Sequence, residues 1–139
     1  MENGADFTKR DGQIGVLEVA SRYGQKEIIQ LLLKKGADVN EPKGCYGGPL
    51  CGAVFFGQEM TVRLLLDEGA AVNVKGGPFG NPLQLAALMG CETIVQCLLE
   101  NGAEVNACGE REQKTALRLA LLNGHEAIAR LLRQNGAVE

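Results

Sequence analysis

The sequence predicts an all-α solenoid, built from stacked helix-turn-helix pairs that are each followed by a projecting finger. The main observation is an internal repeat. Residues 36–40 (Gly-Ala-Asp-Val-Asn) return as 69–73 (Gly-Ala-Ala-Val-Asn) and 102–106 (Gly-Ala-Glu-Val-Asn), at intervals of 33 residues. A truncated copy begins at Gly136 and a degraded copy at Gly4. Self-similarity at such a period indicates a repeat architecture, in which each unit buries its apolar face against its neighbours.

The repeat period divides a single domain, residues 1–139, into successive units. The chain starts and stops at equivalent points of the repeat, which suits either a segment of a longer array or a small protein without further repeats. The expected units are the remnant of a preceding repeat (1–11), repeat 1 (12–43), repeat 2 (44–76), repeat 3 (77–109) and repeat 4 (110–139).

The first helix of each unit is marked at both ends. Pro49 and Pro82 occupy positions suited to the first residue of a helix, and Asn81 and Thr115 are predicted N-caps. A glycine in the same register of every repeat predicts the helix end. The expected first helices are 16–23, 49–56, 82–89 and 116–123.

The second helix of each unit shows apolar residues at spacings of three and four. In repeat 2 these residues are Val62, Leu64, Leu65 and Leu66, which we expect on one buried face. A further glycine, such as Gly36, then ends the helix where a positive φ is favoured. The expected second helices are 26–35, 59–68, 92–101 and 126–135.

Composition excludes several classes of function. The 139 residues are 45% apolar and carry a net charge of −3 without a basic stripe, so neither nucleic-acid nor membrane binding is expected. Five cysteines without a CxxC pair predict neither a metal site nor a disulfide framework. We expect no cofactor, and an intracellular location in the cytoplasm or nucleus.

The residues needed for covalent catalysis are missing. His125 is the only histidine and Ser21 the only serine, about three repeats apart. The glycines near 44–48 and 76–80 lack the Gly-Lys-Ser/Thr of a phosphate-binding loop. We therefore expect no enzyme and no catalytic residue. The alternative is acid–base chemistry in an apolar groove by Glu18, Tyr23, Cys51 or Arg118.

These motifs resemble the ankyrin repeat over essentially the whole chain. Its Thr-Pro-Leu-His phrase appears as 48–51 (Gly-Pro-Leu-Cys), 81–84 (Asn-Pro-Leu-Gln) and 115–118 (Thr-Ala-Leu-Arg), and its Gly-His pair as 124–125. Residues 75–84 also resemble the fingers of ankyrin arrays in fungal multidomain proteins, including NOD-like receptors. The resemblance implies an L-shaped stack with hairpin fingers, a turn-stabilising role for His125, and protein binding on the concave side.

Two adjacent columns of the aligned repeats face the groove in that family. They hold large apolar residues in three of the four repeats, whereas such positions are commonly polar or mixed. A contiguous apolar patch on a surface marks an interaction site. The alternative is that neighbouring repeats or fingers pack these side chains. The predicted binding anchors are Tyr23, Phe55, Phe56, Leu88 and Met89.

The fingers and the groove margin complete the predicted binding surface. Tyr46 and Phe79 lie 33 residues apart on successive fingers, either as contact residues or as rings that stack on each other. A polar column of Glu18, Cys51, Gln84 and Arg118 replaces the family histidine. We favour a local hydrogen-bonding ladder with solvated ends over a ligand-orienting line. The expected polar rim consists of Arg22, Glu18, Arg118 and Arg111.

Together these observations predict a non-catalytic module that binds a protein or peptide along its concave groove and fingers. One alternative is a small-molecule or catalytic pocket in the same groove. Another is a scaffold segment that self-associates through uncapped terminal repeats.

Overall fold

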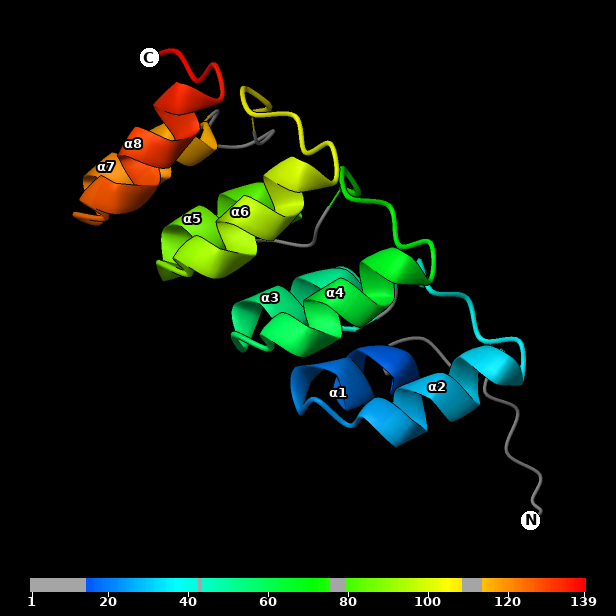
Figure 1. The fold of residues 1–139 in the computed structure, drawn as a ribbon. Coiled ribbons are helices and arrows are strands. Elements are labelled where there is room, and N and C mark those ends of the chain that lie inside the picture. The colour runs from blue at the N-terminus through cyan, green and yellow to red at the C-terminus, as the bar shows by residue number, and fades with distance from the viewer. Residues whose placement is uncertain (1–14, 43, 76–79, 109–113) are drawn as a thin grey trace.

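The computed structural model describes residues 15–42, 44–75, 80–108 and 114–139. In these residues the chain forms four helix pairs that stack one after another along the solenoid (Figure 1). No helix within these ranges is long and apolar enough to cross a membrane. The helices are α1 Val16–Arg22, α2 Lys26–Lys34, α3 Pro49–Phe55, α4 Glu59–Asp67, α5 Pro82–Met89, α6 Glu92–Glu100, α7 Ala116–Leu122 and α8 Glu126–Gln134.

The sequence signals at the helix ends operate as expected, and each helix ends within one residue of its predicted bound. Asn81 accepts a hydrogen bond from the backbone N–H of Gln84, and the Gln84 side chain accepts one from the N–H of Asn81, forming a capping box. Thr115 caps α7 through the N–H of Arg118. Gly90 ends α5 with φ at 79°, in the left-handed region that glycine adopts without strain.

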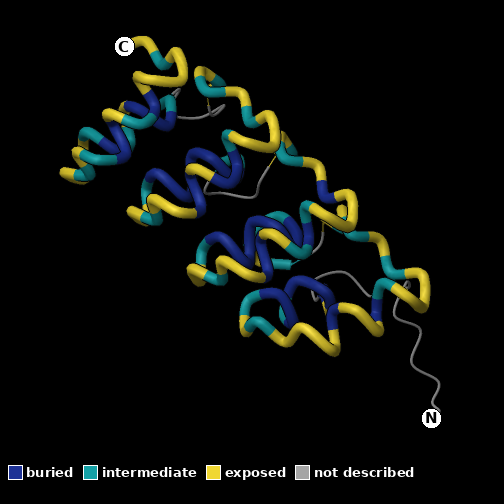
Figure 2. Tube along the Cα trace, in the orientation of Figure 1, coloured by how far each residue is buried: buried dark blue, intermediate teal, exposed yellow. Residues whose placement is uncertain are grey.

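The core lies between successive helix pairs (Figure 2). The first helices form one continuous layer, in which α3 contacts both α1 and α5, and α5 contacts α7. In the second helices only part of the apolar run is fully buried: Val62 and Leu65 are inaccessible, whereas Leu64 is half-buried. The expectation that all four of these residues lie on one buried face is therefore wrong for Leu64 and Leu66, which lie at the margin of the core and are half-buried.

The asparagine of the repeated Gly-Ala-x-Val-Asn phrase joins one repeat to the next. Asn73 Oδ1 accepts from the backbone N–H of Glu104 (2.8 Å), and its Nδ2 donates to the carbonyl of Gly102 (3.1 Å). Asn106 makes the same pair of bonds with Val138 and Gly136. Both groups of each amide are thus used, and they satisfy backbone atoms at the base of the following finger.

The fingers are built from turns. The described finger residues form no β-strand, so in this part of the chain the fingers are loops and the hairpins that the resemblance implied are not seen as paired strands. Gly48, with φ at 128°, leads the finger into α3, where Pro49 is the first helical residue as predicted.

Replacement of Leu65 by alanine tests the stacking register. Because Leu65 is fully buried between helix pairs, we expect Leu65→Ala to lower the free energy of unfolding by about 2–5 kcal/mol. Met60→Ala is the control on the same helix, since Met60 is 76% exposed and should change stability by less than about 0.5 kcal/mol. Urea unfolding measures both, and equal losses would contradict the register.

Candidate functional site

A row of exposed apolar side chains lies at the C-terminal ends of the first helices. Tyr23 is 58% exposed, Phe56 40% and Met89 40%, and all three occupy one column of the aligned repeats. Leu122, from the adjacent column, is 57% exposed at the end of α7. We call Tyr23, Phe56, Met89 and Leu122 the helix-end strip. Tyr23, Phe56 and Met89 are thus accessible, and their role as binding anchors stays a prediction.

Aromatic rings hold one end of the strip in place. Tyr23 and Phe56 lie 5.9 Å apart between ring centroids, which joins repeat 1 to repeat 2. Tyr46 stacks on Phe55 at 4.6 Å and meets Phe56 edge-on at 5.6 Å. Tyr46 therefore packs against the first helix of its own repeat. This contact favours a ring that holds the finger in place over a ring that projects freely into solvent.

Phe55 and Leu88 are less accessible than the strip. Both are half-buried and pack against the core, as does Tyr46. They share the column of Leu122, next to the column of Tyr23, Phe56 and Met89, and the ring of Phe55 contacts that of Phe56. Of the other predicted site residues, Phe79 and Arg111 lie outside the described residues.

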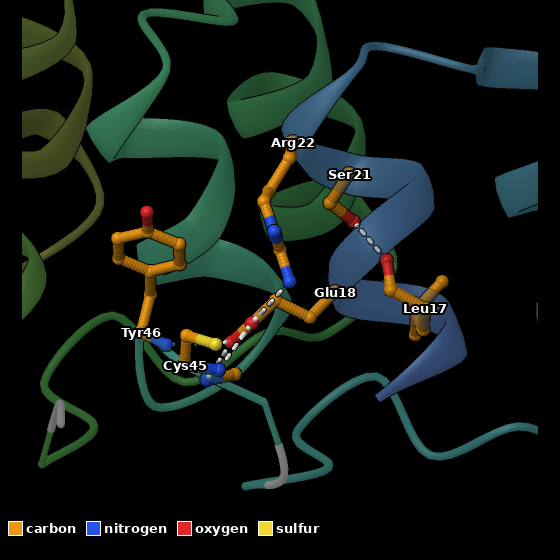
Figure 3. Close-up of polar contacts among 7 residues, drawn as sticks. Leu17, Glu18, Ser21, Arg22, Cys45 and Tyr46 are labelled. Carbon is orange, nitrogen blue, oxygen red and sulfur yellow. Dashed lines mark hydrogen bonds and ion pairs between the residues drawn. The ribbon is translucent and has the colours of Figure 1, made fainter. Parts of the chain in front are cut away.

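Glu18 is the main correction to the predicted site. It was expected at the solvated rim, but only 1% of it is exposed. Its carboxylate accepts hydrogen bonds from the backbone N–H groups of Cys45 (2.8 Å), Tyr46 (3.2 Å) and Gly48 (2.9 Å) in the following finger (Figure 3). The finger wraps the carboxylate so closely that a Cβ on Gly44 would collide with it.

Arg22 links this carboxylate to the aromatic cluster. Its Nη2 lies 3.5 Å from Glu18 Oε2, one turn earlier on α1, and its guanidinium carbon lies 5.3 Å from the centre of the Tyr46 ring (Figure 3). The Nε atom is buried and has no hydrogen-bond partner among the described residues. Arg22 is thus half-buried, and it braces the finger instead of standing fully in solvent.

Two members of the column that replaces the family histidine, Glu18 and Gln84, form hydrogen bonds with the following finger, but Glu18 is buried and is not the solvated end that was expected. Gln84 Nε2 donates to the carbonyl of Lys114 in the next finger (2.6 Å), as Glu18 binds the finger of repeat 2. Arg118, at the C-terminal end of the column, is exposed as predicted. Glu18 and Gln84 therefore form hydrogen bonds between one repeat and the next. The sequence indicates this only when each residue is compared with the finger that follows it.

Cys51 belongs to the same column, and its environment disfavours the reactive thiolate form. Burial raises the pKa of its thiol to about 12, with a further upward contribution from the charge of Glu18. Burial also raises the pKa of Cys91 and of Cys97. In the part of the chain that the structure describes, no group of three His, Cys, Asp or Glu residues could hold a metal ion.

His125 has a structural role, as the resemblance implied. Its Nε2 lies 3.2 Å from the carbonyl of Leu88 in the preceding repeat, so this nitrogen is the donor. Gln58 makes the equivalent bond in repeat 2, where Nε2 donates to the carbonyl of Arg22 (2.9 Å). These side chains satisfy a carbonyl left open at the end of the preceding first helix.

Comparison with protein families agrees with this geometry. A family model described as ankyrin repeats in three copies matches residues 50–138, and a single ankyrin repeat matches residues 16–43. The chain belongs to the ankyrin-repeat family. A search of curated proteins finds no match. Ankyrin repeats are generally protein–protein interaction modules, and their domains are typically non-catalytic.

Two finer statements about the repeats are not tested by the family match. The repeat boundaries at 11/12, 43/44, 76/77 and 109/110 stay predictions. The narrower resemblance to fungal arrays rests on residues 75–84, part of which lies outside the described residues.

Substitution of Glu18 tests the carboxylate that holds the finger. In Glu18→Gln one acceptor oxygen becomes an N–H₂ group that faces backbone donors, so we expect a loss of about 1–3 kcal/mol in unfolding free energy. Arg118→Gln changes the same column at an exposed position and should cost less than about 0.5 kcal/mol. A neutral Glu18→Gln, measured by urea unfolding, would contradict the observed bonding.

Alkylation of the folded chain tests the environment of Cys51. With a pKa of about 12, its thiolate fraction at pH 8 is roughly one in ten thousand, and the side chain is inaccessible. We therefore expect iodoacetamide to modify the exposed Cys45 and Cys108 while Cys51 stays unmodified until the chain unfolds. Peptide mass spectrometry reads each site, and rapid modification of Cys51 in the folded chain would contradict this environment.

Proposed function

We propose that this ankyrin domain binds a protein or peptide along the concave side of its stack, with the helix-end strip as the apolar contact surface. The observation that carries this proposal is the exposure of large apolar side chains at the same place in successive repeats. In a repeat stack such a row runs along the solenoid, so an extended partner can contact several repeats at once.

The aromatic cluster adds rigidity to this surface. Phe56 contacts Tyr23, Tyr46 and Phe55, so its ring is held before any partner arrives. A side chain that is already ordered loses little rotamer entropy on binding, and aromatic residues in such positions are frequent hot spots. Phe56 is therefore the proposed central anchor, with Tyr23 and Met89 on either side.

Two arginines of the polar margin lie among the described residues, and their contacts differ. Arg118 is exposed at the end of its column, whereas Arg22 is bound to Glu18 and lies over Tyr46. Arg118 is thus the better rim residue for an acidic side chain of the partner. Glu18 supports the groove from inside and has no proposed contact with the partner.

The alternative of a catalytic or small-molecule site in the same groove remains a prediction, and its named residues lend it little support. Glu18 uses its carboxylate oxygens on backbone donors, and the raised pKa of Cys51 disfavours the thiolate needed for attack. Tyr23 and Arg118 lie in different repeats, three apart along the stack.

The test is a comparison of captured partners. Immobilised wild-type chain and the Phe56→Ala/Met89→Ala variant are exposed to the same cell extract, and bound proteins are identified by mass spectrometry. We expect a partner held by the wild type and lost from the variant, because truncating a hot-spot residue costs about 2 kcal/mol, or roughly 30-fold in affinity.

The matched control is Met60→Ala/Val138→Ala, which removes two apolar side chains outside the strip that are more exposed than Phe56 and Met89. This variant should capture the partner as the wild type does. Thermal unfolding of all three chains completes the test. A large fall in the midpoint of Phe56→Ala/Met89→Ala would show that these side chains pack the fold, and equal capture by all three chains would overturn the proposed site.

A further inference from the structure

A second apolar surface lies at the N-terminal end of the stack. Val16 on α1 is 37% exposed, and Ile28 and Leu31 on α2 are each 48% exposed. We call these three residues the end face. Where a preceding helix pair is present, the same columns are covered: Ile28 corresponds to buried Thr61, Ile94 and Ile128, and Val16 corresponds to buried Pro49, Pro82 and Ala116.

Contacts inside the stack show what this side of a repeat normally meets. A Cβ on Gly52 would lie 2.9 Å from Cγ of Glu18 and 3.3 Å from Cγ of Arg22, so the start of α3 faces α1 of the repeat before it. Gln58 donates to the Arg22 carbonyl across the same boundary. The side chain of its counterpart Gln25 is exposed and forms no hydrogen bond with another described residue. The end face therefore has the composition of an inter-repeat interface, and within the described residues no helix pair covers it.

The opposite end of the stack is a poor match for this surface. Arg133 occupies the column in which the earlier repeats place Leu33, Leu66 and Leu99, and Arg118 ends the column of Glu18. Both arginines are exposed, and Arg133 Nη2 lies 2.7 Å from Glu139 Oε2. Head-to-tail stacking would bury these charges against Val16, Ile28 and Leu31, at a substantial desolvation cost.

The charges around the end face instead match a second copy of the same surface. Glu27 lies four residues before Leu31 on α2, and Lys35, the C-cap of α2, lies four residues after it, so the three follow one side of the helix and its end. Glu27 and Lys35 are exposed and form no ion pair with another described residue. When two α2 helices run antiparallel about an axis at Leu31, each Glu27 meets the Lys35 of the other copy.

We propose that two copies of this chain associate through their end faces, around a two-fold axis that passes between the Leu31 side chains. The apolar centre consists of Val16, Ile28 and Leu31, and the rim of two Glu27–Lys35 pairs. This arrangement is self-complementary and closes at two copies, as isologous interfaces do. It leaves the helix-end strip of each copy outside the contact, so the proposed partner binding does not depend on it.

Sedimentation equilibrium of the full chain tests the proposal. Over roughly 1 µM to 1 mM the mass should rise from that of one chain to that of two, and no further. Leu31→Asp should weaken the association by at least about tenfold, because it places two like charges at the centre. Met60→Asp, on α4 and outside the end face, is the control and should leave the association unchanged.

A charge exchange tests the predicted pairing. Lys35→Glu sets four carboxylates at the rim and should weaken the association, while Glu27→Lys/Lys35→Glu restores both pairs and should recover it. Circular dichroism confirms that each variant is folded. A single-chain mass at every concentration, growth beyond two copies, or no recovery in the exchanged variant would each overturn the proposal.

Discussion

Every helix of this chain depends on its neighbours, because seven to nine residues are too few to form a stable helix alone. Each pair gains its stability by burying apolar residues against the pair before and the pair after it. Leu65 and Leu98 are fully buried in this way, at positions one repeat apart in the chain. Stability is then approximately a sum of interfaces between repeats, so the surfaces at the two ends differ in kind from every surface between them.

Polar contacts make these interfaces specific. A turn-built finger has backbone N–H groups with no helix or strand to satisfy them, and leaving such groups unpaired in a buried place is costly. Asn73 and Asn106 serve the finger bases, while Glu18 serves the finger of repeat 2 with three charge-assisted hydrogen bonds. A neutral side chain at position 18 offers fewer acceptor sites. The same carboxylate holds Arg22 beside Tyr46, so the finger, the ring cluster and α1 are ordered together.

The parts of this structure that depend on local sequence were predictable, and those that depend on partners distant in the chain were less so. Helix bounds followed from proline, cap and glycine positions, since each acts within one turn. The exposure of Tyr23, Phe56 and Met89 followed from the columns of the repeat. The burial of Glu18 did not, because it is imposed by donors 27 to 30 residues later. Leu64 is half-buried and Leu65 is fully buried, although both belong to the same apolar pattern. The difference arises because a helix turns by 100° from one residue to the next.

Comparison of columns separates the two apolar surfaces by their origin. Ile28 is exposed in repeat 1 while its counterparts are buried, so its exposure reflects its place at the end of the stack. Tyr23, Phe56 and Met89 are exposed in repeats with and without a preceding helix pair, so their exposure is a property of the column itself. A preceding helix pair would cover the first surface and leave the second open. Because the two surfaces share no residue, substitutions at one should add to those at the other except near Tyr23, which lies on the repeat that carries both.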